Sequence, residues 1–230
     1  SIQGVDVNGK TVLVRVDFNV PTRNGAISDD SRIRAALPTL NLLREGGATV
    51  VVCSHFGRPK GQVVEDMRLG IVRERLSELL GAPVADAAGP NGGRSASVIS
   101  GLSSGEFALL ENLRFETGEE TNDEDFSKHL ASLADLYVND AFGAAHRAHA
   151  STVGVAAHLP AYAGLLMERE LEMLGRSLEG SRGATIAIVG GANVADKIQV
   201  LRHLSAKVAT ILVGGGMAAA FYVAQGRAGV

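Results

Sequence analysis

The sequence holds one cysteine and no long hydrophobic run. A lone Cys53 excludes an internal disulfide and is typical of a reducing compartment, and packing within a strand is its expected role. No apolar stretch reaches the roughly 18 residues that a membrane-spanning helix needs. The first residues also lack the basic-then-apolar layout of a signal peptide. These features predict a cytoplasmic protein with no membrane partner.

An excess of charge of either sign is missing as well. The formal net charge is −3 over 230 residues, so nothing overall favours nucleic acid or an anionic membrane, and neither partner is predicted. Hydrophobic residues make up 46% and charged residues 20%, which is typical of a globular chain and excludes a disordered one. A cluster of arginines in this chain would therefore be a local concentration in a mildly acidic protein.

The sequence does contain a regular alternation of strand-like and helix-like segments. β-Branched apolar runs predict strands, and apolar residues at helical spacing predict helices between them. This order is typical of a parallel sheet covered by helices on both faces, so the predicted fold class is α/β, Rossmann-like with three layers. The predicted strands are 12–20, 48–54, 107–113 and 136–139, and the predicted helices are 28–47, 67–80, 122–135 and 165–178.

Two further segments carry local signals. Pro38 lies inside the predicted helix 28–47 and predicts a kink or a division into two helical pieces. Segment 87–105 is rich in glycine and serine, which predicts a surface loop with at most one helical turn.

The alternation restarts after residues 179–183, and we place a domain boundary near the preceding helix. This division gives a first domain at 1–164, an interdomain helix and linker at 165–182, and a second α/β domain at 183–230. Two strands are too few to bury a stable core, so the second domain is expected to be incomplete. Its predicted strands are 184–189 and 208–213, and its predicted helices are 194–205 and 217–225.

Polar and charged side chains follow four predicted strands at the point where each strand ends. The carboxyl ends of parallel strands meet at one edge of a sheet, and ligands bind there in open α/β folds. Arginines and histidines gathered at that edge predict an anionic small-molecule ligand, although each turn taken alone could be a polar cap. The residues are Asp17, Asn19, His55, Arg58, Arg114, Asn139, Asp140, His146 and Arg147.

Two glycine-rich turns, 190–197 and 214–217, each join a predicted strand to a predicted helix. Such turns present backbone N–H groups to phosphate, although each could be no more than a tight turn. Neither contains the Walker A or the dinucleotide fingerprint, which disfavours a nicotinamide dehydrogenase. The spacing of His146 and His149 is compatible with zinc, but no third ligand falls at a recognisable spacing, so no metal site is predicted.

Seven of these segments, taken together and in this order, resemble the phosphoglycerate kinases. The resemblance implies a two-domain kinase, usually monomeric. It moves a phosphoryl group reversibly between 1,3-bisphosphoglycerate and ADP, giving 3-phosphoglycerate and ATP, with Mg²⁺ carried by the nucleotide. The N-terminal domain of such enzymes holds the phosphoglycerate and the C-terminal domain holds the nucleotide. The matching segments are 15–21, 30–39, 55–61, 110–115, 139–149, 190–197 and 214–217.

The resemblance also implies roles for individual residues. Arg32 would lie closest to the transferred phosphoryl group and act as the catalytic residue. The nucleotide-binding residues would be Gly191, Ala192, Lys197 and Gly215. The phosphoglycerate would be surrounded by Asp17, Phe18, Asn19, Arg32, His55, Gly57, Arg58, Arg114, His146 and Arg147.

The sequence departs from the family pattern in two places. The family motif reads Gly-Gly-Ala-Lys, but Asn193 stands at the lysine position here, which keeps a donor and loses the full charge. The chain also stops at Val230, where the family continues with most of its nucleotide domain. Two hypotheses follow: a phosphoglycerate kinase, or a truncated and catalytically impaired phosphoglycerate-binding protein of the same family.

Overall fold

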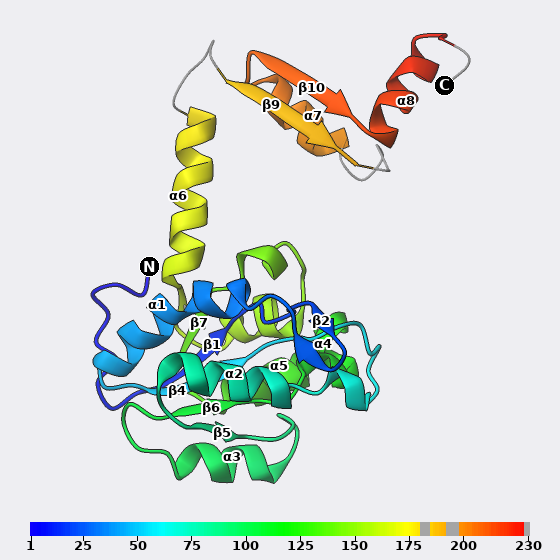
Figure 1. Cartoon of the computed structure of the whole chain (residues 1–230). Helices are drawn as coiled ribbons and strands as arrows, with labels where there is room; N and C mark the ends of the chain where they lie inside the picture. Colours follow the sequence, from blue (N-terminus) through cyan, green and yellow to red (C-terminus); the bar gives the residue numbers. More distant parts are fainter. Residues whose placement is uncertain (180–184, 192–197, 228–230) are drawn as a thin grey trace. The chain divides into compact units, whose positions relative to one another are not determined.

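A six-stranded sheet organises the first part of the chain (Figure 1). The computed structural model describes residues 1–179, 185–191 and 198–227. The strands follow the order β5-β6-β4-β1-β7-β8, and every neighbouring pair is parallel, which confirms the predicted α/β class. The strands are β1 (Thr11–Arg15), β4 (Thr49–Cys53), β5 (Val84–Asp86), β6 (Phe107–Leu109), β7 (Leu136–Asn139) and β8 (Ala161–Ala163).

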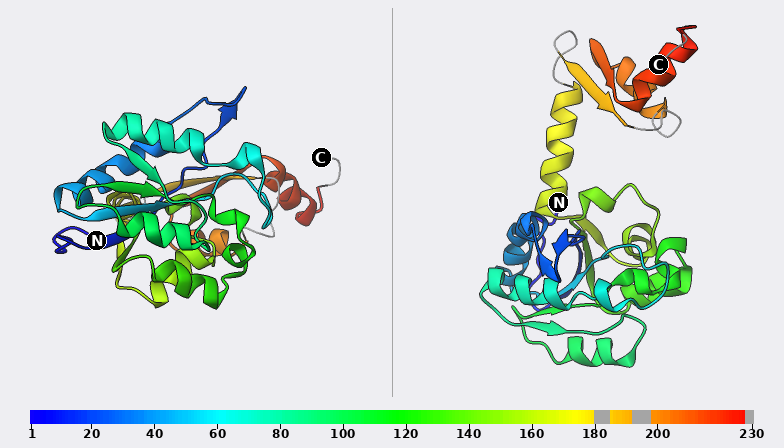
Figure 2. Two further views of the ribbon diagram at one scale, coloured as in Figure 1. Left: turned by 90° about the horizontal axis from the view of Figure 1, so that it is seen from below. Right: turned by 45° about the vertical axis from the view of Figure 1, so that its right-hand side comes forward.

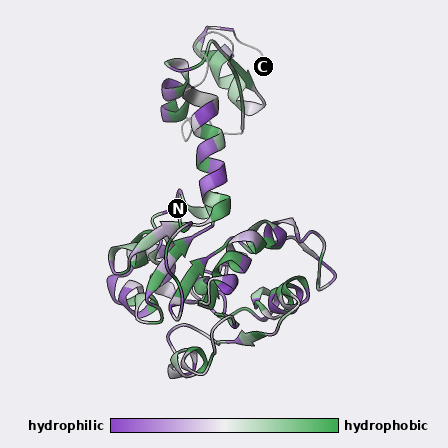
Figure 3. Ribbon diagram, turned by 90° about the vertical axis from the view of Figure 1, so that its left-hand side faces the viewer, coloured by the Kyte–Doolittle hydropathy of each residue, from purple (hydrophilic) through white to green (hydrophobic). Residues whose placement is uncertain are grey.

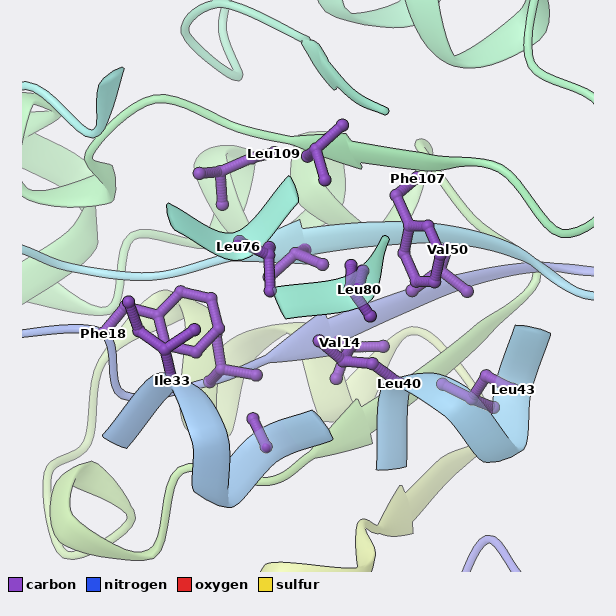
Figure 4. Packing of buried hydrophobic residues seen from close by; sticks show 14 of the residues in the cluster. Val14, Phe18, Ile33, Leu40, Leu43, Val50, Leu76, Leu80, Phe107 and Leu109 are labelled. Atoms are coloured by element: carbon purple, nitrogen blue, oxygen red, sulfur yellow. The ribbon is translucent and has the colours of Figure 1, made fainter. Parts of the chain in front are cut away.

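Helices cover both faces of this sheet because successive side chains of a strand point to opposite sides. In β1, Val12 and Val14 belong to the core beneath α1 (Ser31–Glu45) and α2 (Gly70–Leu80). Leu13 belongs to the opposite core, beneath α3 (Gly93–Ser100) and α5 (Glu124–Ala131). The views in Figure 2 show helices on either side of the strands, and Figure 4 shows the α1–α2 core from close by. With both faces covered, ligands can approach the strands only at their ends.

The two longest helices of this region differ from their predicted forms. Helix α1 runs without interruption through Pro38, so of the two predicted alternatives, a kink or two helical pieces, the second was wrong. The helix is held to the sheet on both sides of the proline, by buried Ile33 on one side and Leu40 on the other. Helix α2 begins at Gly70 rather than at residue 67, because a separate 3₁₀ turn, η1 (Glu65–Met67), precedes it.

The segment between α2 and β7 contains more structure than predicted. Helix α3 lies where residues 87–105 were predicted to form a loop with at most one helical turn, and β6 has three residues rather than seven. Strand β5 lies just before that segment and was not predicted. After β6 the chain turns into the 3₁₀ segment η2 (Leu113–Phe115), whose backbone is capped by the Asn112 side chain. The predicted helix 122–135 is shorter as α5 and is preceded by a separate α4 (Thr117–Thr121).

Short elements fill the remaining connections. A hairpin of β2 (Thr22–Arg23) and β3 (Ala26–Ile27) follows the β1 loop. Strand β8, which was not predicted, pairs with β7 at the edge of the sheet. Between them lie η3 (Phe142–Ala144), η4 (Ala150–Gly154) and η5 (Val155–Ala157).

The chain divides into two compact units, which we call unit 1 (Ser1–Arg169) and unit 2 (Glu170–Val230). Helix α6 (Leu165–Glu179) begins in unit 1 and continues into unit 2, and it mixes hydrophilic and hydrophobic residues along its length (Figure 3). Unit 2 contains the parallel strands β9 (Ile186–Gly190) and β10 (Thr210–Gly214) with helices α7 (Ile198–Ser205) and α8 (Gly216–Ala224). Among the described residues, no helix combines the length and apolar character needed to cross a bilayer.

Candidate active site

Adjacent strands deliver the predicted site residues to one edge of the sheet in unit 1. Strand β1 lies between β4 and β7, and in the ladder Arg15 is level with Cys53 on one side and Asn139 on the other. The loops that begin after these three residues are therefore neighbours at the carboxyl ends of the strands.

The loop after β1 holds the first group of predicted residues. The Oδ1 atom of Asp17 accepts hydrogen bonds from the backbone N–H of Asn19 at 3.2 Å and from Nη1 of Arg32 at 3.1 Å. Arg32 lies in the first turn of α1, and its side chain is half exposed. Phe18 is fully buried, so its ring packs in the core rather than at a surface that a ligand could reach.

The loop after β4 is held in place by backbone contacts and by one buried amide. Gly57 has φ +63°, and a Cβ atom there would lie 2.7 Å from Sδ of Met67, so this position requires glycine. Asn19 Oδ1 accepts from Gly57 N at 2.9 Å. The buried Asn112 side chain accepts from Phe56 N at 3.0 Å and donates to the carbonyls of Phe56 and Met67 at 2.7 and 2.9 Å.

Two arginines of very different burial lie in or beside the loop after β4. Arg58 is exposed, and no carboxylate of the described residues lies within 4.0 Å of it, so its charge is free to meet a ligand. Arg114 in η2 is buried, and its Nη1 donates to the Gly57 carbonyl at 2.8 Å. Burial lowers the pKa of Arg114, although Glu120, 3.1 Å from its Nε, acts in the opposite direction. An arginine stays charged through such a shift.

A buried arginine inside the sheet joins these loops. Arg15 is almost completely buried, and its Nε donates to Ser151 Oγ at 2.8 Å while its Nη2 lies 3.1 Å from His55 Nδ1. Burial lowers the pKa of His55 to about 2, and the charges of Arg15, Arg114 and Arg147 add to this effect. His55 is therefore neutral. Because a guanidinium can only donate, Nδ1 must be the acceptor and the imidazole proton lies on Nε2.

Glu119 in α4 supplies a buried negative charge to the same group. Its Oε1 accepts from Ser151 Oγ at 2.6 Å, its Oε2 accepts from Ser151 N at 3.0 Å, and His149 Nδ1 lies 3.6 Å from Oε1. Burial by itself would raise the pKa of Glu119, but the contacts from His149 and Ser151 and the charge of Arg15 outweigh it and leave the pKa lowered. The carboxylate is therefore ionised.

The segment after β7 completes this edge of the sheet. His146 is exposed, and Arg147 Nε lies 3.4 Å from His146 Nε2. The charge of Arg147 contributes to the lowered pKa values of His55 and Arg114. His149 turns toward Glu119 instead of toward His146. Within the described ranges, no group of three or more His, Cys, Asp or Glu side chains could hold a metal ion.

Asn139 and Asp140 have structural partners instead. Asn139 Oδ1 accepts from Ala141 N at 3.0 Å, which closes the turn after β7. Asp140 is buried, and its Oδ1 accepts from the backbone N–H groups of Leu166 and Met167 at 2.9 and 3.1 Å. Asp140 thus caps the start of α6, and burial raises its pKa despite these bonds. The structure places both side chains outside the arginine cluster.

In unit 2, two of the predicted nucleotide-binding residues lie side by side. Gly215 has φ +65° and precedes α8, and a Cβ atom there would lie 3.4 Å from the Gly191 carbonyl oxygen. That carbonyl accepts from Met217 N at 3.0 Å. The other predicted positions, Ala192, Asn193 and Lys197, lie outside the described residues.

Sequence reasoning missed four residues of this arrangement: Arg15, Asn112, Glu119 and Ser151. Arg15 had a detectable signal, since an arginine within the apolar run 12–16 of a buried strand requires a buried partner. Glu119 could not be distinguished from Glu116 and Glu120, because burial separates them and the sequence does not. Asn112 and Ser151 carried no signal of their own.

The edge of the sheet thus gathers guanidinium groups, a neutral imidazole and backbone N–H groups, which suits a small ligand with more than one anionic group. The family model for phosphoglycerate kinase matches residues 2–229. The chain belongs to the phosphoglycerate kinase family.

Solved structures agree with this assignment. The chain is similar to the phosphoglycerate kinase from Coxiella burnetii, with 39% identity and a TM-score of 0.83. It is also similar to the enzyme from Pyrococcus horikoshii, with 37% identity and a TM-score of 0.84. Each match covers 98% of this chain and 57% of the solved chain, so the chain spans a little over half the length of these relatives.

Proposed function

We propose that this protein acts in reversible phosphoryl transfer between 1,3-bisphosphoglycerate and ADP, with unit 1 binding the phosphoglycerate. The observation that carries the proposal is the cluster at the carboxyl ends of β1, β4 and β7, in a chain of this family. There Arg58 is exposed and has no carboxylate partner among the described residues, Arg114 is buried, and His55 is neutral. This combination supplies positive charge from the two arginines and a hydrogen-bond donor from the neutral imidazole.

The chemistry of the ligand suits these groups. 3-Phosphoglycerate carries a phosphate and a carboxylate, and each charge-assisted hydrogen bond to such a group contributes about 1.5–3 kcal/mol. Arg58, Arg114 and Arg147 would bind the anionic ends, and His55 would donate from Nε2. Asp17 and Asn19 could meet the hydroxyl group, and Arg32 would approach the transferred phosphoryl group after leaving Asp17. Positioning and charge neutralisation provide most of the catalysis in phosphoryl transfer.

Unit 2 would take part through the nucleotide. Its glycine turns at Gly191 and Gly215 present backbone groups of the kind that cradle phosphate. Lys197 and Ala192 would contact the nucleotide, and Mg²⁺ would arrive bound to ADP or ATP as part of the substrate. The free thiol of Cys53 is buried and compatible with a reducing compartment, in keeping with the predicted cytoplasmic location.

The second candidate is a phosphoglycerate-binding protein of the same family with impaired catalysis. Asn193 favours it, because the resemblance implies a lysine that stabilises charge at this position. Loss of a comparable transition-state donor lowers turnover about 10²–10³-fold. A coupled assay with 1,3-bisphosphoglycerate and ADP separates the two candidates, since measurable turnover that Asn193→Lys does not raise excludes the impaired form. Asn193→Lys should raise turnover if the missing charge limits the reaction.

Calorimetry with 3-phosphoglycerate tests the proposed binding site. Arg58→Ala should weaken binding about 10–100-fold without lowering the melting temperature, because Arg58 is exposed and forms no ion pair within the part of the chain that the structure describes. Lys10→Ala removes one positive charge just before β1, at the amino ends of the strands, and should leave binding unchanged. Equal effects of the two variants would mean that only overall charge matters and would contradict the assigned site.

A further inference from the structure

Glu119 is a fully buried carboxylate that lies one layer behind the proposed ligand site. A buried charge is costly unless it is paired and hydrogen-bonded, so its partners indicate why it is there. Its partners are Ser151, through both oxygens, and His149. It makes no hydrogen bond or ion pair with Arg58 or Arg114, the groups proposed to hold the ligand, although its charge acts to raise the pKa of Arg114.

A chain of directed hydrogen bonds leads from Glu119 to His55. The Ser151 hydroxyl donates its proton to Glu119, so its lone pairs are left to accept from Arg15 Nε at 2.8 Å. This contact and the bond from Nη1 to the Val16 carbonyl hold the guanidinium in one orientation. In that orientation Nη2 meets His55 Nδ1 at 3.1 Å. Because a guanidinium only donates, Arg15 itself sets the direction of the bond to His55, and Glu119 acts by fixing, through Ser151, where that guanidinium lies.

The consequence for His55 is a single tautomer. Nδ1 must accept from Arg15, so the proton lies on Nε2, which has no hydrogen-bond partner in the described part of the chain. We propose that Glu119 is a positioning residue that, through Ser151 and Arg15, holds His55 in the Nε2–H tautomer and so presents a donor to an anionic ligand. The statement that His55 donates to an anionic ligand rests on the proposed function, whereas the statement that Glu119 fixes the His55 tautomer does not.

The substitution Glu119→Gln tests, with little change of shape, whether Glu119 fixes the position of the Arg15 guanidinium through Ser151. The carboxylate accepts from both Ser151 N and Ser151 Oγ, but a glutamine amide offers one acceptor oxygen and one donor NH₂ group. One of the two Ser151 donors would then face another donor. Ser151→Ala breaks the same chain one step later and leaves Glu119 with its bond from the Ser151 backbone N–H. Glu124→Gln, at an exposed glutamate on α5, is the matched control.

Nitrogen NMR of the imidazole of His55 reads the tautomer directly in the ligand-free protein. The wild type and Glu124→Gln should show Nε2 protonated and Nδ1 unprotonated. Glu119→Gln and Ser151→Ala should each show a mixture of tautomers. A purely structural role for Glu119 would lower stability and leave the tautomer unchanged. An unchanged Nε2–H tautomer in both folded variants would overturn the proposal, and if Glu119→Gln does not fold, Ser151→Ala decides alone.

Calorimetry with 3-phosphoglycerate gives the second readout. Each variant should weaken binding roughly tenfold, the effect of one charge-assisted hydrogen bond. The double variant should bind about as weakly as the weaker single variant, because both act through one chain. Fully additive losses would contradict a common path. If the wild type itself does not bind 3-phosphoglycerate, the proposed function fails, while the NMR result still decides the role of Glu119.

Discussion

Units 1 and 2 use the same βα pattern but bury their strands to very different extents. In unit 1 the central strands are covered on both faces, and Val12, Leu13 and Val14 are completely buried. In unit 2 the strands alternate between intermediate and exposed residues, and Ile188 in the middle of β9 is 82% exposed. The difference lies in how many helices and neighbouring strands cover each face of the sheet.

This difference determines what kind of site each unit can hold. Unit 1 places Arg15 and Glu119 inside its core, where a low dielectric strengthens their interactions and neighbouring groups hold them in one geometry. The described part of unit 2 positions its glycine turns through backbone contacts such as Met217 N to Gly191 O. Side-chain chemistry that depends on a directed buried network is therefore found in unit 1.

The largest expected effect is the difference in stability between two Leu→Ala substitutions, one in each unit. Leu40→Ala, at a fully buried position of α1, should lower the free energy of unfolding by about 2–5 kcal/mol. Leu212→Ala in β10 should cost less than about 1 kcal/mol, because half of that side chain is already exposed. Urea unfolding of both variants measures the difference. Equal losses would show that the two sheets are comparably buried in solution.

A second prediction concerns the amide that holds the loop after β4. Asn112→Ala should lower stability by about 2–4 kcal/mol, since buried groups of Phe56, Met67 and Arg114 lose their partners. It should also weaken 3-phosphoglycerate binding, although every proposed ligand-contacting side chain is retained. Asn91→Ala, at an exposed asparagine, is the control and should change neither quantity. Unaltered binding by Asn112→Ala would mean that the loop does not need this support.

The third prediction follows from the lowered pKa of His55. Burial, reinforced by nearby arginines, lowers this pKa from 6.5 in the unfolded chain to about 2. Between these values the unfolded state binds the extra proton, so stability falls as the pH falls, by about 1.4 kcal/mol per pH unit. From pH 6.5, where the unfolded imidazole is half protonated, to about pH 5 the loss should be about 1.6 kcal/mol. Chemical unfolding at each pH measures it, and His55→Asn should give a flatter profile. A wild-type profile as flat as that of His55→Asn would contradict the lowered pKa.

The smallest effect is expected at the surface of unit 1. Lys128 and Glu124 form an exposed ion pair one turn apart on α5, with the nitrogen and oxygen 3.2 Å apart. Lys128→Ala should change the free energy of unfolding by no more than about 0.5 kcal/mol, and the change should vanish at high salt. A loss comparable to that of Leu40→Ala would mean that surface charge, rather than the core, holds unit 1 together.

The sequence predicted the long elements well and the short ones poorly. Strands β4 and β7 were predicted from their apolar runs, and β1 was predicted at the right place but ends at Arg15 rather than at residue 20. β5 and β6 have three residues each, too few for a period to be visible, and β5 was overlooked entirely. Pro38 was expected to kink or divide α1, but the helix is not divided, because burial on both sides of the proline outweighed the local penalty.

For the candidate site as well, the features that depend on local sequence could be predicted, and those that depend on contacts between distant residues could not. Its place at the carboxyl ends of the strands could be predicted, because parallel strands bring their ends together whatever the loops contain. The hydrogen-bond chain behind it could not, since Arg15 and Ser151 are 136 positions apart in the sequence. Only the fold decides that Ser151 accepts from Arg15 and that Glu119, among its neighbouring glutamates, is buried.

The central claim is that unit 1 holds a preformed site for phosphoglycerate at the carboxyl ends of its sheet. Titration of ¹⁵N-labelled protein with 3-phosphoglycerate, followed by NMR, tests it most directly. Saturable shifts should appear at His55, Gly57, Arg58 and Arg114, and the resonances of β9 and β10 should stay in place. A well-folded sample that shows no shifts, or shifts only in unit 2, would contradict the claim.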